Sequence, residues 1–131
     1  MLVVFEDRVE SSIIRLLRPG FRHCFCLVGG DLAWTVCDPL ETRIELFPLL
    51  GFNEGELAKH YACGGRTVLL GNVAAAPAPP RAAMRAISCV EVVKRVLNFQ
   101  AQRVFTPFQL YRALLAAGEP PRRFHRYGEN S

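Results

Sequence analysis

The chain has 131 residues, of which 50% are hydrophobic and 21% are charged, and its formal net charge is +4 at pH 7. This balance is typical of a folded globular protein and excludes an intrinsically disordered one. The length favours a single domain with a continuous core, and no apolar run approaches the roughly 18 residues that span a bilayer. The N-terminus has no basic leader followed by an apolar stretch, so we expect no signal peptide.

The N-terminal part of the chain, residues 1–72, carries mostly strand patterns. Residues 2–5 are apolar and partly β-branched, which predicts a short strand. Asp7 and Glu10 have the spacing of a capping box ahead of several apolar residues, so we expect a helix of about two turns that ends at the next Pro-Gly pair.

The clearest pattern in this part is a β-hairpin. Side chains alternate along residues 21–28, with His23 on the same face as phenylalanine and leucine side chains. Gly29 and Gly30 supply the predicted turn, and residues 32–37 supply the return strand. The elements expected after the hairpin are a strand at 42–47, a weak helix at 53–61 and a strand at 67–70.

Two helices are expected in the C-terminal part of the chain. Ser88 and Glu91 have capping-box spacing ahead of a periodic apolar segment, and Thr106 and Gln109 repeat that spacing with Pro107 at the first helical position. Strands therefore come first and helices last. This order predicts an α+β fold in which a small antiparallel sheet packs against helices.

Two further segments have compositions that predict no regular structure. Residues 73–82 are rich in alanine and proline, and we interpret them as an extended linker to the helical part at 83–118. Residues 119–131 are interpreted as a basic, solvated tail. No wider basic-aromatic pattern accompanies this tail, so nucleic-acid binding is not expected. The arginines of the tail are Arg122, Arg123 and Arg126.

The cysteines indicate reduced thiols rather than a disulfide framework, because their number is odd and their settings are dissimilar. Zinc binding is one alternative for His23 and the cysteines near it. On a strand, however, Cys24 and Cys26 point away from His23, and no Cys-x-x-Cys pair is present, so we expect neither a metal nor a cofactor. We expect Cys24, Cys26 and Cys37 to pack between the sheet and the helices. The full set is Cys24, Cys26, Cys37, Cys63 and Cys89.

Cys89 is the first candidate catalytic residue, because Ser88 as N-cap makes it the first residue of a helix. Unpaired N–H groups and the positive end of the helix dipole favour a thiolate there. The same N–H groups could hold an oxyanion. The structural alternative is that Cys89 is a small apolar residue that packs the helix start.

His23 and Asp38 are the other two candidates, because the hairpin brings them onto one face. A two-residue turn at the glycines pairs Val28 with Asp31 and sets His23 opposite Val36, with Asp38 diagonally beside the imidazole. That is where a carboxylate that orients a catalytic imidazole should lie. A three-residue turn would move Asp38 to the opposite face. The alternatives are a buried core histidine and an aspartate that opens an ordinary turn.

The order His23, Asp38, Cys89 is the reverse of the order in papain, and it resembles the circularly permuted branch of the NlpC/P60-like, papain-fold superfamily. The resemblance covers residues 20–116 and implies that Cys89 is the nucleophile, His23 the general base and Asp38 the residue that orients it. Many relatives carry tyrosine or asparagine where this chain has Ser88. Small proteins of tailed-phage morphogenesis are similar in the segments Gly20-Phe21-Arg22-His23-Cys24, Asp38-Pro39-Leu40, Cys89-Val90-Glu91-Val92-Val93-Lys94 and Thr106-Pro107-Phe108-Gln109-Leu110-Tyr111.

The resemblance implies a phage-associated thiol hydrolase that cleaves an amide bond, with peptidoglycan peptides as the expected substrate class. The alternative is a virion structural or assembly protein, a tail or capsid component that keeps the papain-like fold without catalysis. Acyl transfer to a lipid or amine would use the same residues. The expected partners are cell-wall peptides or other virion proteins, and an oligomer is left open. The expected location is the host cytoplasm during synthesis and then the virion.

Overall fold

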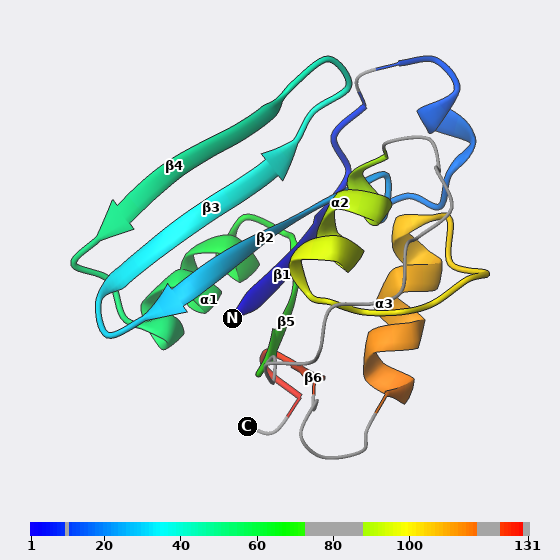
Figure 1. Ribbon diagram of the computed structural model, residues 1–131. Coiled ribbons are helices and arrows are strands. Elements are labelled where there is room, and N and C mark those ends of the chain that lie inside the picture. Colours follow the sequence, from blue (N-terminus) through cyan, green and yellow to red (C-terminus); the bar gives the residue numbers. More distant parts are fainter. Residues whose placement is uncertain (10, 73–87, 118–123, 130–131) are drawn as a thin grey trace.

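The computed structural model describes residues 1–9, 11–72, 88–117 and 124–129. These residues form an α+β fold with a six-stranded antiparallel sheet in the order β4-β3-β2-β1-β5-β6 (Figure 1). This confirms the predicted fold class. The elements are β1 (Leu2–Glu6), a 3-10 turn η1 (Ile14–Leu16), β2 (His23–Gly30), β3 (Ala33–Pro39), β4 (Ile44–Leu50), α1 (Glu54–Cys63), β5 (Thr67–Gly71), α2 (Cys89–Val96), α3 (Pro107–Ala116) and β6 (Phe124–Arg126).

Strand β1 lies inside the sheet, between β2 and β5, and helices cover both of its faces (Figure 1). Leu2 and Val4 pack with α1 on one face, while Val3 and Phe5 pack with α2 and α3 on the other. Burial on both faces explains why β1 is a continuous apolar run rather than an alternating one. These two apolar layers are the core of the fold. The layer that contains Val3 and Phe5 holds α2 against the sheet.

The turn between β2 and β3 differs from the predicted one. Asp31 and Leu32 form it, with φ of 49° and 67°, which is the left-handed pair that a type I′ hairpin needs. Gly29 is the residue that must be glycine, because a Cβ there would lie 2.2 Å from the Ala33 carbonyl oxygen. The glycine pair therefore ends β2 and does not make the turn.

This turn changes the strand register but not the faces of the strands. Val36 lies opposite Leu27 and not opposite His23, so the predicted pairing was wrong. The register moves by an even number of residues, which leaves every side chain on its predicted face. His23 and Asp38 therefore remain on one face of the hairpin.

The predicted N-terminal helix is absent from the described residues between β1 and β2, where η1 forms and no side chain caps it. The Asp7 carboxylate instead accepts a hydrogen bond from the Gly20 N–H at 2.9 Å and pairs with Arg22 at 3.1 Å. Asp7 thus joins the two ends of the loop rather than capping a helix. Glu10, the other half of the predicted capping box, lies outside the described residues.

The remaining elements lie close to their predicted positions, with two additions. Strand β4 continues through Pro48, which the outermost strand of the sheet tolerates. Strand β6 was not predicted: Phe124 pairs with Gly71 of β5 and is buried, in a segment interpreted as a solvated tail. The predicted linker at 73–82 lies outside the described residues. Within the described ranges, no helix is long and apolar enough to cross a membrane.

Candidate active site

Cys89 is the first residue of α2, and Ser88 is its N-cap, as the sequence predicted. The Ser88 hydroxyl accepts a hydrogen bond from the Glu91 N–H at 3.2 Å, and the Ser88 carbonyl accepts one from Val92 at 3.0 Å. The first N–H groups of a helix have no acceptor within it. Those of Cys89 and Val90 are therefore the ones that could hold an oxyanion next to the thiol.

His23 and Asp38 form a buried hydrogen bond at the ends of their strands. The distance from His23 Nε2 to Asp38 Oδ1 is 2.6 Å, and both side chains are buried. The other partner of the His23 side chain is the Cys89 thiol. With Nε2 engaged by the carboxylate, Nδ1 is the imidazole nitrogen left to face the sulfur. The structure therefore brings the three predicted residues together.

The surroundings of Cys89 favour a thiolate paired with an imidazolium. The hydrogen bond from the Cys24 side chain lowers the pKa of Cys89 most. Burial raises this pKa, whereas the hydrogen bond and the charge of His23 lower it further. The resulting pKa of Cys89 is about 5. Burial lowers the pKa of His23, but Asp38 and Cys89 outweigh it and raise the pKa to about 9. Between these values the thiolate–imidazolium pair is the favoured state.

Cys24 is a functional candidate that the sequence did not reveal as such. It lies in the core between the sheet and α2, as predicted, together with Cys26 and Cys37. Burial raises the pKa of Cys24 well above its usual range, so it remains a thiol and donates to the Cys89 thiolate. The backbone N–H of Cys24 also contacts the Cys89 sulfur. Only the packing of α2 on β2 reveals these contacts.

Arg8 is a second residue that the sequence did not reveal. Its Nη1 donates to Asp38 Oδ2 at 3.0 Å, so His23 and Arg8 each hold one oxygen of the same carboxylate. Burial raises the pKa of Asp38, but His23 and then Arg8 outweigh it and lower the pKa. Arg8 Nε also lies 3.0 Å from the buried carboxylate of Glu6, whose other oxygen accepts from Arg66 Nε at 2.6 Å. This chain of charges fixes the orientation of Asp38.

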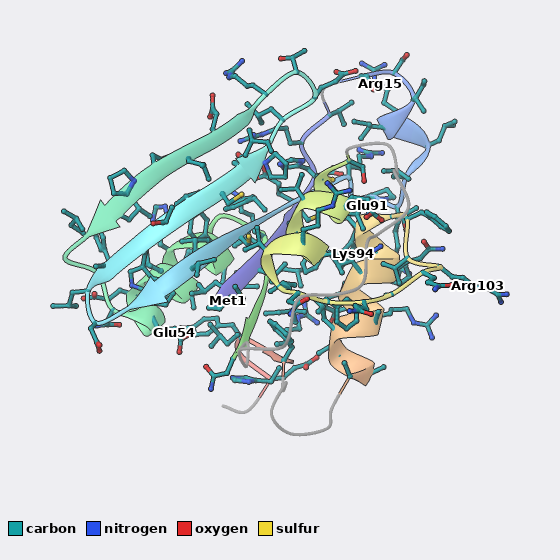
Figure 2. The ribbon with its side chains drawn as sticks, viewed as in Figure 1. Met1, Arg15, Glu54, Glu91, Lys94 and Arg103 are labelled. Atoms are coloured by element: carbon teal, nitrogen blue, oxygen red, sulfur yellow. The ribbon has the colours of Figure 1, made fainter. Side chains whose placement is uncertain are left out.

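A cavity of about 240 Å³ opens beside Cys89 and His23. One of its walls is formed by Phe105, in the segment before α3, and by Pro107, the first residue of α3. Lys94 of α2 holds that segment in place, because its buried Nζ donates to the Val104 carbonyl at 3.2 Å and to Glu91 Oε1 at 2.6 Å. Figure 2 shows Glu91 and Lys94 together on α2. The cavity gives a ligand room directly at the thiol.

The described residues contain no group of three or more histidine, cysteine, aspartate or glutamate side chains arranged to hold a metal ion. Cys26 and Cys37 face each other across β2 and β3, and hydrogen-bond to one another in the core.

No family model, curated protein or solved structure matches the chain. The side chains themselves define what the site can do. A thiolate at a helix start, an imidazole in contact with it and a carboxylate behind the imidazole form the arrangement that nucleophilic cysteine chemistry requires.

The Cys24→Ala variant is expected to raise the pKa of Cys89, because it removes the hydrogen bond that lowers this pKa most. A hydrogen bond to a charged group corresponds to a shift of about one to two pH units. The pKa can be measured from the pH dependence of iodoacetamide alkylation at Cys89, followed by mass spectrometry. Cys26→Ala is the matched control, since Cys26 lies in the same core but contacts Cys37. Equal pKa values of Cys89 in the two variants would show that Cys24 does not stabilise the Cys89 thiolate.

Proposed function

We propose that the protein is a thiol hydrolase that cleaves an amide bond, with Cys89 as nucleophile, His23 as proton carrier and Asp38 as the residue that orients His23. One observation carries this proposal: the buried 2.6 Å bond from His23 to Asp38 stands beside a thiol whose pKa is lowered to about 5. Structural cysteines in apolar surroundings have a raised pKa instead, as Cys26 does.

The first half of the reaction forms an acyl-enzyme. The Cys89 thiolate attacks the amide carbonyl carbon, a C–S bond forms, and the carbonyl oxygen takes the negative charge next to the N–H groups of Cys89 and Val90. The C–N bond then breaks. The His23 imidazolium gives its proton to the leaving amine, which departs neutral, and a thioester remains on Cys89.

The second half regenerates the thiolate. His23 is now a neutral base, and it takes a proton from a water molecule that attacks the thioester carbonyl. The C–S bond breaks, the carboxylic acid product leaves, and the thiolate–imidazolium pair is restored. Asp38 stabilises the imidazolium throughout, and Arg8 holds Asp38 in position.

We further propose a circularly permuted papain-like core of the NlpC/P60-like type, and peptidoglycan peptides as the substrates of a phage-associated enzyme. The order His23, Asp38, Cys89 supports the core, as does the packing of the cysteine-bearing helix on the strand that carries the histidine. The substrate class follows from the resemblance of the motifs around these three residues.

A direct test is to incubate the protein with purified muropeptides and follow new amino groups by mass spectrometry. We expect cleavage of one peptide bond type, and acid quenching should trap the acyl group on the peptide that contains Cys89. The exposed Cys63 is an internal reference, because it should remain unacylated. Acylation of both thiols to the same extent, or no cleavage of any amide, would count against the proposal.

A second candidate function is a virion structural or assembly module, and the outermost strand of the sheet favours it. On β4, Leu46 and Leu50 are 66% and 69% exposed, a setting typical of a surface that binds another protein. Reaction with iodoacetamide at pH 6 distinguishes the two functions. A structural role predicts that Cys89 reacts no faster than the exposed Cys63, whereas a catalytic role predicts selective reaction at Cys89.

A further inference from the structure

The cavity beside Cys89 has the size and position of a pocket for one part of a substrate. Its volume of about 240 Å³ is below the roughly 300–1,000 Å³ of pockets that enclose drug-sized ligands. It accommodates a side chain or a short acyl group rather than a length of polypeptide. Because the thiol and the imidazole line this cavity, a group bound in it lies next to the reacting carbonyl.

The walls of the cavity are mostly apolar, and beside the start of α2 they come from segments far apart in the chain. Ile14 and Leu17 belong to the turn around η1, Leu40 follows β3, and Phe105 precedes α3. Residues three apart on a 3-10 turn lie on one side of it, so Ile14 and Leu17 both reach the cavity while Leu16 is exposed. Phe105 is 62% exposed, which leaves a large aromatic surface for a ligand to cover.

Arg22 brings a cation with a free donor to this apolar cavity. Its Nη1 pairs with Asp7 at 3.1 Å. Its Nη2 donates at 3.4 Å to the carbonyl of Arg15, which is part of η1 and is labelled in Figure 2. Its Nε is buried and has no hydrogen-bond partner within the described part of the chain. A buried N–H without an acceptor is unfavourable. An oxygen atom of a bound ligand would satisfy it if the side chain turned to present Nε to the cavity.

Among the described lining residues, the charge of Arg22 is offset least by neighbouring charges. Arg8 also lines the cavity, but its guanidinium is bound to the carboxylates of Asp38 and Glu6. The positive charge of His23 is offset by the Cys89 thiolate beside it. Glu41 is the carboxylate among the lining residues, and it is exposed to solvent. Asp7, which pairs with Arg22, is more than half exposed and so screens Arg22 only in part.

We propose that this cavity is an acyl-group pocket that selects an apolar group bearing a carboxylate, with Arg22 as the residue that binds the carboxylate. This assignment rests on the proposed function in that Cys89 is taken as the nucleophile. It adds the substrate class: amides whose acyl part is apolar and anionic.

The test uses two alkylating probes that differ only in charge, N-chloroacetyl-phenylalanine and its neutral amide. Each rate of alkylation at Cys89, followed by mass spectrometry at pH 7, is divided by the rate with chloroacetamide to remove differences in thiol reactivity. We expect the carboxylate probe to react about tenfold faster, the size of one charge-assisted hydrogen bond. Equal rates for the two probes would overturn the proposal.

Three variants test which residue causes the preference for the carboxylate probe. Arg22→Gln should bring the two probes to equal rates. Asp7→Asn should increase the preference, because it removes the counter-charge of Arg22 and keeps an oxygen for the Gly20 N–H. Arg18→Gln is the control: Arg18 stacks on Phe108 outside the cavity, so the preference should persist. An unchanged preference in both Arg22→Gln and Asp7→Asn would assign the carboxylate to another group and overturn the proposal.

The probes require a reactive thiol but no turnover, so the two proposals can fail separately. Suppose that muropeptides are not cleaved but the preference for the carboxylate probe is present and depends on Arg22. The pocket assignment is then supported and the proposed hydrolase activity is wrong. If amides are cleaved and the probes react equally, the hydrolase stands and the pocket assignment is wrong.

Discussion

The Cys89→Ser variant is expected to lose amide hydrolysis by at least about 10⁴-fold, the scale seen when a catalytic nucleophile is removed. The hydrogen bonds of Cys24 and His23 lower the pKa of the thiol to about 5, so it attacks as a thiolate. A hydroxyl has a much higher pKa, and the same contacts would leave it un-ionised. The release of amine from muropeptides, followed by mass spectrometry, measures the loss.

The fold should survive this substitution, because serine retains the size of the side chain and helix α2 is held by other residues. Val90 and Val93 anchor α2 in the core, and Ser88 caps it. Circular dichroism should therefore be unchanged. Cys63→Ser is the matched control, an exposed cysteine changed in the same way, and it should keep full activity. Undiminished hydrolysis by Cys89→Ser would remove Cys89 from the mechanism.

The position of Cys89 could be predicted because it depends on local chemistry. A serine N-cap and the amide three residues later meet whenever the helix forms, and the Ser88–Glu91 bond is such a contact. Only half of the predicted capping box formed, since the Glu91 side chain pairs with the buried Lys94 instead. The hydrogen bond from the Glu91 N–H to the Ser88 hydroxyl was enough to start the helix at Cys89.

The pairing of His23 with Asp38 could be predicted for a different reason. The turn residues were wrong, yet alternation along a strand has a period of two, so an even shift of register preserved the shared face. Arg8 and Phe105 reach the site from segments with no periodic pattern, and their roles come from contacts between residues far apart in the chain. The sequence pattern carries no signal for such contacts.

Hydrolysis by the wild-type protein is expected to show a bell-shaped pH profile of kcat/KM, rising through about pH 5 and falling through about pH 9. The pKa of Cys89 is lowered, so the thiolate is lost as the pH falls below about 5. The pKa of His23 is raised, so the proton for the leaving amine is lost as the pH rises above about 9. Rates of amine release measured across this range give both limbs.

Alkylation by iodoacetamide separates the two limbs, because that reaction needs the thiolate but no proton donor. Its rate at Cys89 should rise through about pH 5 with hydrolysis and should not fall at about pH 9. If alkylation and hydrolysis both fall at high pH, the upper limb reports a general change of the protein rather than the loss of the His23 proton.

The Asp38→Asn variant should move only the upper limb, and it should move it to lower pH. An amide oxygen can still accept from His23 Nε2, so the imidazole keeps its orientation, but the negative charge that raises the pKa of His23 is gone. Glu45→Gln is the matched control, because Glu45 lies opposite Asp38 on β4 and pairs with Arg43 at the surface. An upper limb that stays in place in Asp38→Asn, or moves equally in Glu45→Gln, would show that the carboxylate of Asp38 does not hold the proton on His23.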